Sequence, residues 1–461
     1  MPARDVLPMR ARIDSRLSGL PGLPRFSLFP LASLALLLSC SSSTPTGFGN
    51  GPTGSPSGAT GPTGGTASTG PSGPVVAADG GSVGGLIGNV GEAGAPDSGP
   101  PPMIDGGFQC VMNPSQYDIP GNGCDDDADG MIDNVLVCDS GLAATGPAGD
   151  FVKAIGLCRT SADATHWGVV SATYTNGHTK TAGGPMNFDQ QHGLLSTFGT
   201  VLVPREGYMF GALSSGSASA TDSDTGPLFK GGKTGMQGAG TGLGGGNGGD
   251  VPTGFPKSSA ACAVSSTVND VIDLKIQIRV PTNAKGFSVD FNFMTGEWPE
   301  YVCTTFNDSF IAYLQSKAFN SGTPDNISFD TAGNTISVNN NFFQACTAGV
   351  QTGCSGTSMG TSTCTLGPNQ LGGTGFAAET PPIAYCGGAV STSGGGTGWL
   401  TSKAPAQPGE VISLEFLIWD TGDASFDSSV LLDNFTWVPD PLPPTPVTMP
   451  SPPPPPPPPP K

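Results

Sequence analysis

Two stretches with an apolar residue at every second position, far apart in the sequence, constrain the fold of this chain most strongly. Residues 287–293 read FSVDFNF and residues 412–418 read ISLEFLI, so apolar side chains fall on every second position. Because successive side chains of a strand point to opposite faces, both stretches are expected to be strands with one apolar face. Each leads through a short acidic connector into a second strand-like run, which ends at Leu314 in the first stretch and at Trp437 in the second.

Further runs predict the same class of structure. Residues 271–280 read VIDLKIQIRV, the clearest single strand pattern, and shorter strand-like runs cover 166–174 and 199–204. One short helix is expected at 150–157. Many short strands with Gly-rich turns and little helical periodicity indicate an all-β fold, an antiparallel β-sandwich or jelly roll.

Composition divides the chain into segments. Gly and Pro account for 71 and 46 of the 461 residues, a level at which low-complexity segments are expected. The predicted organisation is a signal peptide at 1–39, a disordered Gly/Ser/Thr/Pro tether at 40–107, a small Asp-rich and Cys-containing subdomain at 108–165, the β-sandwich at 166–438, and a Pro-rich tail at 439–461 with polyproline II character.

The charge balance and one motif departure argue against two classes of partner. The formal net charge of −18 disfavours nucleic acid, which requires a basic face for its phosphates. Nucleotide binding is not expected either, because the Gly232-Lys233-Thr234 segment has Pro227 where a phosphate loop requires Gly.

The amino terminus predicts export and lipid anchoring. Arg10, Arg12, Arg16 and Arg25 precede a short apolar run that ends in Leu37-Leu38-Ser39-Cys40, a lipobox-like sequence in which Cys40 would be lipidated. We therefore expect attachment to a membrane through an amino-terminal lipid, at the outer membrane or cell surface. The ten remaining cysteines are even in number, which fits disulfides in an oxidising compartment.

An Asp-rich segment predicts a calcium site. Four aspartates occupy positions one, three, five and nine of an EF-hand-like loop: Asp125, Asp127, Asp129 and Asp133. Gly130 stands at the sharp turn, whereas Leu136 occupies the twelfth position in place of a bidentate Glu. Cys124 and Cys138 bracket the loop, and a disulfide between them would close it. The alternative is an acidic turn solvated by water.

The two connectors carry further acidic residues. Asp420, Asp423 and Asp427 are a second candidate calcium site, with the capping of a tight turn as the alternative. The first connector offers carboxylates and aromatic rings that suit a surface glycan or protein ligand: Glu297, Trp298, Glu300, Tyr301 and Asp308. The enzymatic alternative is a carbohydrate hydrolase that uses Glu297 and Glu300 as paired carboxyls.

No other motif predicts catalysis. Residues 356–360 match the esterase pattern G-x-S-x-G, but all three histidines precede it, whereas the esterase order requires a later His. We therefore expect a non-catalytic protein.

The paired strands and several motifs resemble a known family. Residues 117–134 (YDIPGNGCDDDADGMIDN), 154–158 (AIGLC), 167–172 (WGVVSA) and 192–199 (HGLLSTFG), together with the two connectors, resemble choice-of-anchor L domain proteins of the myxobacterial surface-lipoprotein type. This resemblance covers roughly residues 110–438 and implies a secreted or surface-attached bacterial protein. It implies no activity, so adhesion or ligand binding, stabilised by calcium, is the expected function.

Overall fold

The computed structural model describes residues 110–183, 188–218, 248–259, 262–339, 342–353, 360–376, 384–385, 389–390, 394–424 and 426–453. The predictions for the signal peptide, for Cys40, for the tether and for the final prolines lie outside these residues. So do residues 227–234 and most of 356–360. No helix within the described ranges is both long and apolar enough to cross a membrane.

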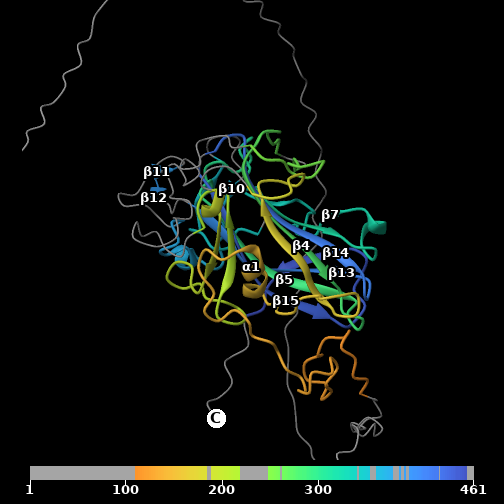
Figure 1. The fold of residues 1–461 in the computed structure, drawn as a ribbon. Coiled ribbons are helices and arrows are strands. Elements are labelled where there is room, and N and C mark those ends of the chain that lie inside the picture. Colours follow the sequence, from red (N-terminus) through yellow and green to blue (C-terminus); the bar gives the residue numbers. More distant parts are fainter. Residues whose placement is uncertain are drawn as a thin grey trace, which may run out of the picture. The chain divides into compact units, whose positions relative to one another are not determined.

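Two antiparallel six-stranded sheets form the body of the domain (Figure 1). The first has the order β1-β4-β14-β6-β7, with β8 also paired to β6: β1 (Gly168–Thr175), β4 (Val268–Arg279), β14 (Val411–Thr421), β6 (Ser309–Gln315), β7 (Asp325–Asn326) and β8 (Ile336–Ser337). The second has the order β16-β13-β5-β15-β3-β2: β16 (Val447–Pro450), β13 (Gly395–Pro405), β5 (Gly286–Thr295), β15 (Ser428–Val438), β3 (Phe210–Ser214) and β2 (His192–Leu195).

The remaining elements are short. Two strand pairs lie outside the main sheets: β9 (Gln351–Thr352) with β10 (Gly360–Thr361), and β11 (Ala384–Tyr385) with β12 (Ala389–Val390). Helical structure consists of α1 (Ala148–Ala154) and the 3-10 turns η1 (Phe188–Gln190), η3 (Asn320–Gly322) and η4 (Pro368–Leu371).

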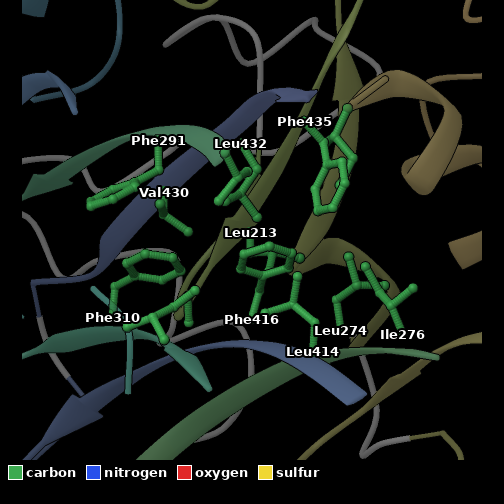
Figure 2. Close-up of a cluster of buried hydrophobic side chains, with 14 of the residues drawn as sticks. Leu213, Leu274, Ile276, Phe291, Phe310, Leu414, Phe416, Val430, Leu432 and Phe435 are labelled. Atoms are coloured by element: carbon green, nitrogen blue, oxygen red, sulfur yellow. The ribbon is translucent and has the colours of Figure 1, made fainter. Parts of the chain in front are cut away.

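The two sheets pack face to face through the apolar positions that the alternation predicts. Phe287, Val289, Phe291 and Phe293 of β5 and Ile412, Leu414, Phe416 and Ile418 of β14 all belong to one core. Figure 2 shows Phe291 of the second sheet facing Phe310 of the first, with ring centroids 5.1 Å apart. The predicted all-β antiparallel sandwich is therefore confirmed, and its core lies between the sheets.

The outer faces of the strands are also covered. All ten residues of β5 are buried, including Asp290 and Asn292 on the face away from the core. A second apolar cluster, which includes Phe198, Met294 and Phe376, covers this outer face. A third, which includes Leu417 and Trp419, covers part of the other sheet. Loops thus bury polar positions that period two alone would leave in water.

Two sequence predictions for local structure need correction. Residues 199–204 form no strand, because Gly199 takes φ +64° and turns the chain so that the N–H of Phe198 donates to the carbonyl of Leu202 at 2.9 Å. The predicted helix lies slightly earlier, since α1 begins at Ala148 and ends at Ala154.

Residues on both sides of the predicted sandwich range, 166–438, pack with its sheets. Beyond residue 438, where the Pro-rich tail was expected, β16 pairs with β13, and the hydroxyls of Thr448 and Ser402 lie 2.8 Å apart. Before residue 166, Phe151 and Ile155 are buried in the main core. Part of the predicted 108–165 subdomain and the first residues of the tail therefore share the packing of the sandwich.

Candidate metal centre

The Asp-rich segment gathers four carboxylates at one point, which we call the Asp cluster. Its members are Asp118, Asp125, Asp127 and Asp129, each with one carboxylate oxygen within 4.8 Å of the others. Local hydrogen bonds shape the loop, because the N–H groups of Asp129 and Gly130 donate to Asp125 at 3.1 and 2.9 Å. Gly130 takes φ +90° at the sharp turn, a conformation that favours glycine. The Asp cluster could hold a metal ion.

Asp133, the fourth aspartate of the predicted calcium loop, does not belong to the Asp cluster and instead accepts backbone hydrogen bonds. Its carboxylate accepts the N–H of Asn122 at 3.0 Å and the N–H of Gly123 at 3.0 and 3.2 Å, and it lies outside the Asp cluster. Asp118 takes the fourth place instead, and it also accepts the N–H of Asp126 at 2.7 Å. The loop spacing could not identify Asp118, because this residue precedes the motif. The only sequence signal for Asp118 as a ligand candidate is that it is an acidic residue within 117–134.

The disulfides hold this segment differently from the prediction. Cys124 is bonded to Cys110 and Cys138 to Cys158, so the predicted Cys124–Cys138 bridge is wrong. Each bridge ties one end of the Asp-rich loop to a flanking segment, which fixes the loop without closing it on itself. Two further disulfides, Cys262–Cys303 and Cys346–Cys364, lie elsewhere in the domain.

A guanidinium group compensates part of the negative charge. Nη2 of Arg159 forms ion pairs with Asp127 and, at 3.1 Å, with Asp129. Burial raises the pKa of Asp127 despite this neighbour, whereas the Asn134 side-chain hydrogen bond holds the pKa of Asp129 below its usual value. A cation bound by Asp127 and Asp129 would therefore compete with Arg159 for their carboxylate oxygens.

A cavity of about 140 Å³ adjoins the Asp cluster. Its wall includes Asp118 and Asp127 together with the rings of Tyr117, Trp167 and Trp437. The rings of Trp167 and Trp437 meet edge to face at 6.3 Å, and Arg159 stacks over Trp167. Cavity and Asp cluster therefore share residues, which places an aromatic binding surface beside the candidate metal centre.

One carboxyl in the wall of the cavity has a raised pKa. Burial, with the charge of Asp139 as a second cause, raises the pKa of Glu206 to about 7. At neutral pH this side chain is therefore able to donate a hydrogen bond to a ligand as well as to accept one.

The predicted ligand-binding residues of the first connector lie mostly in the interior. Glu297, Trp298 and Asp308 are buried, and the Trp298 ring stacks on Phe343 with centroids 4.4 Å apart. Glu300 and Tyr301 are half-buried. Three of these five side chains therefore lack the open surface that binding a glycan would require, because the sandwich packs around them.

The second connector likewise has both buried and exposed acidic residues. Asp420 and Asp427 are buried, whereas Asp423 is exposed and its backbone carbonyl accepts Asn269 Nδ2 at 2.7 Å. The structure thus brings Asp420 and Asp427 inside, and leaves the third aspartate of the predicted second calcium site at the surface.

The fold and this site define a class: a disulfide-bonded antiparallel β-sandwich with an Asp cluster able to hold a metal ion. Comparisons with protein-family models, with curated proteins and with solved structures gave no match.

Proposed function

We propose that this chain is an exported, non-catalytic binding module in which calcium occupies the Asp cluster and orders an adjoining ligand pocket. The single observation that carries the proposal is that Asp118 and Asp127 belong to the Asp cluster and also line the aromatic cavity. A cation held by these carboxylates would fix one wall of the cavity.

The donor set favours calcium among the common metals. Carboxylate oxygens are hard ligands, which suit Ca²⁺ and Mg²⁺, and zinc sites use Cys and His, neither of which belongs to the Asp cluster. Calcium tolerates the irregular geometry of a loop, whereas Mg²⁺ demands a near-ideal octahedron.

The cavity indicates the size and chemistry of the ligand. A cavity of about 150 Å³ accommodates a benzene-sized group, so this one suits a single ring, such as the terminal sugar of a surface glycan or one side chain of a protein ligand. Trp167 and Trp437 provide apolar ring faces and edges, while Arg159 and Glu206 provide polar groups. This combination is typical of sites that bind small ligands.

Binding assays on the purified chain test this function. Glycans and peptides are screened in calcium and in chelator, first with the unmodified protein and then with Trp167→Ala. The matched control is Trp399→Ala, since Trp399 lies outside the cavity wall and stacks with Arg205. The proposal requires binding that Trp167→Ala abolishes and Trp399→Ala retains. Glycan turnover that Glu297→Gln removes would instead support the hydrolase alternative.

We further propose export, lipid attachment at Cys40 and display at the outer membrane or cell surface, together with membership of the choice-of-anchor L family. Four disulfides among the described residues support an oxidising compartment. Membrane fractionation of Cys40→Ala tests the anchor, because loss of the lipid should release the protein. Unchanged partitioning would count against it.

A further inference from the structure

The two acidic connectors of the sandwich meet at one end of its interior. The β5–β6 connector passes from the second sheet to the first, and the β14–β15 connector passes back. Pairing aligns their ends, since Thr295 lies opposite Ser428 in one sheet and Trp419 lies opposite Ser309 in the other. Both connectors therefore close the same end of the core.

At this end, the inward face of two strands changes from apolar to acidic side chains. Asp308 stands two positions before Phe310, and Asp420 stands two positions after Ile418, so each follows the inward face of its strand. Together with Glu297 and Asp427 they form what we call the internal carboxylate cluster. All four side chains are at most 2% exposed.

Hydrogen bonds fix Asp308 against the opposite connector and against one other member, Glu297. Asp308 accepts the N–H of Thr421 at 3.1 Å and the hydroxyl of Ser428 at 2.7 Å, both from the opposite connector or its strands. The N–H of Asp308 in turn points to Glu297 Oε2 at 3.5 Å. Burial and the charge of Asp308 raise the pKa of Glu297. The carboxyls of Glu297 and Asp308 therefore lie close enough to repel each other.

Asp420 has little of the compensation that a buried carboxylate requires. Neither of its oxygens accepts a hydrogen bond of ordinary geometry from the described residues, and it is 1% exposed. Burial raises its pKa, as do the charges of Asp308, Asp427 and Asp270, while the Ser215 hydroxyl opposes the rise. No ion pair found among the described residues involves Glu297, Asp308 or Asp420. A buried carboxylate without well-formed hydrogen bonds is costly, because it loses its hydration and regains little in exchange.

We propose that the internal carboxylate cluster is a second divalent-cation site, with Asp308 and Asp420 as its central ligands and Glu297 and Asp427 beside them. A hard cation would supply the positive charge that Asp308 and Asp420 lack among the described residues, and calcium prefers such an all-oxygen environment. Because the ligands come from both connectors, the ion would clamp the two sheets together. This site shares no residue with the Asp cluster, so it stands apart from the proposed ligand pocket.

Counting bound calcium on the full chain tests the site. The protein is freed of metal with EDTA, returned to buffer, and titrated with CaCl2 by calorimetry. Asp127→Asn reports on the Asp cluster, and Asp420→Asn reports on the internal carboxylate cluster. We expect two equivalents in the unmodified chain and the loss of one in each variant. In EDTA, Asp420→Asn should also raise Tm, because an amide avoids the cost of burying or protonating a carboxylate at this position.

A matched control separates metal binding from general destabilisation. Glu410 is likewise buried, but its carboxylate is satisfied by the Ser316 hydroxyl at 2.5 Å and the Lys317 N–H at 2.9 Å. Glu410→Gln should lower Tm and leave the calcium count unchanged. If Asp420→Asn does not fold, Glu297→Gln provides the same readout.

The outcomes distinguish the two proposed sites. A folded Asp420→Asn or Glu297→Gln protein that binds as much calcium as the unmodified chain overturns the internal site. If Asp127→Asn binds as many calcium equivalents as the unmodified chain, calcium binding by the Asp cluster is overturned and the internal site is not affected. A chain that binds no calcium overturns both.

Discussion

The hydroxyl of Ser428 donates a 2.7 Å hydrogen bond to Asp308, 120 positions earlier in the chain. Ser428 begins β15 in one sheet, and Asp308 immediately precedes β6 in the other. This contact joins the two connectors of the sandwich at the end of its core. It also shows why carboxylates that look like separate acidic turns in the sequence form one group in the fold.

The aromatic core between the sheets should dominate stability. Phe291 is fully buried and packs against Phe310, so Phe291→Ala leaves a large void between the sheets. We expect a loss of about 3–5 kcal/mol in the free energy of unfolding. Urea denaturation followed by tryptophan fluorescence measures this loss. Phe291→Leu, which keeps most of the volume, should cost less, and equal costs for the two variants would contradict the packing argument.

The Cys138–Cys158 disulfide should support both the fold and the Asp cluster. Replacing both cysteines by Ser removes a cross-link between residues 20 apart, with an expected cost of about 2–4 kcal/mol. The control is the Cys346–Cys364 pair, which spans a similar 18 residues away from the Asp-rich segment. Both double variants should unfold at lower urea, but only the first should weaken calcium binding by the Asp cluster. Equal calcium affinity in both would contradict this role.

Arg159 should compete with a cation at the Asp cluster. Its guanidinium forms ion pairs with Asp127 and Asp129, and these must separate if calcium takes the same oxygens. A partly exposed ion pair such as Arg159–Asp127 contributes up to about 1 kcal/mol, so Arg159→Gln should tighten calcium binding roughly fivefold. Calorimetry on an Asp420→Asn background isolates the Asp cluster. Arg279→Gln, which changes the same charge but contacts no member of the Asp cluster, is the control. Unchanged affinity in Arg159→Gln would show that the guanidinium and the ion do not compete.

His192 should make the domain sensitive to acid. Burial lowers its pKa to about 4, and its ring stacks on Tyr174 with centroids 3.8 Å apart. The unfolded chain binds the proton more tightly than the folded one. The contribution of neutral His192 to the free energy of unfolding is therefore fully present above the unfolded pKa of about 6.5, and it falls as the pH drops towards 4. The slope is about 1.4 kcal/mol per pH unit for one such group.

The pH dependence can be assigned by substitution. His192→Phe keeps a ring against Tyr174 but has no titrating nitrogen, so its stability should fall less between pH 6.5 and 4.5. Urea denaturation of both proteins at several pH values measures the difference. Parallel pH profiles would show that His192 does not cause the loss.

The strands and the composition of the core could be predicted because they depend on neighbouring residues in the chain. Period-two alternation at 287–293 and 412–418 correctly assigned the inward faces of β5 and β14. The Asp-rich loop was equally visible, since three of its ligand candidates lie within one short motif. Local patterns failed at 199–204, where a single glycine with positive φ turns an apolar run into a loop.

Only the tertiary structure decided which distant residues meet. Pairing Cys124 with Cys110 rather than Cys138, and bringing Asp118 into the Asp cluster, depends on how the loop folds back on its flanks. The internal carboxylate cluster depends on strand register, because residues from both connectors meet only when β14 pairs with β6 and β15 with β5. The sequence by itself therefore determined which faces of the strands are apolar and where acids accumulate. The packing of the two sheets decided that these acids are buried together, since burial depends on segments that alternation along one strand does not report.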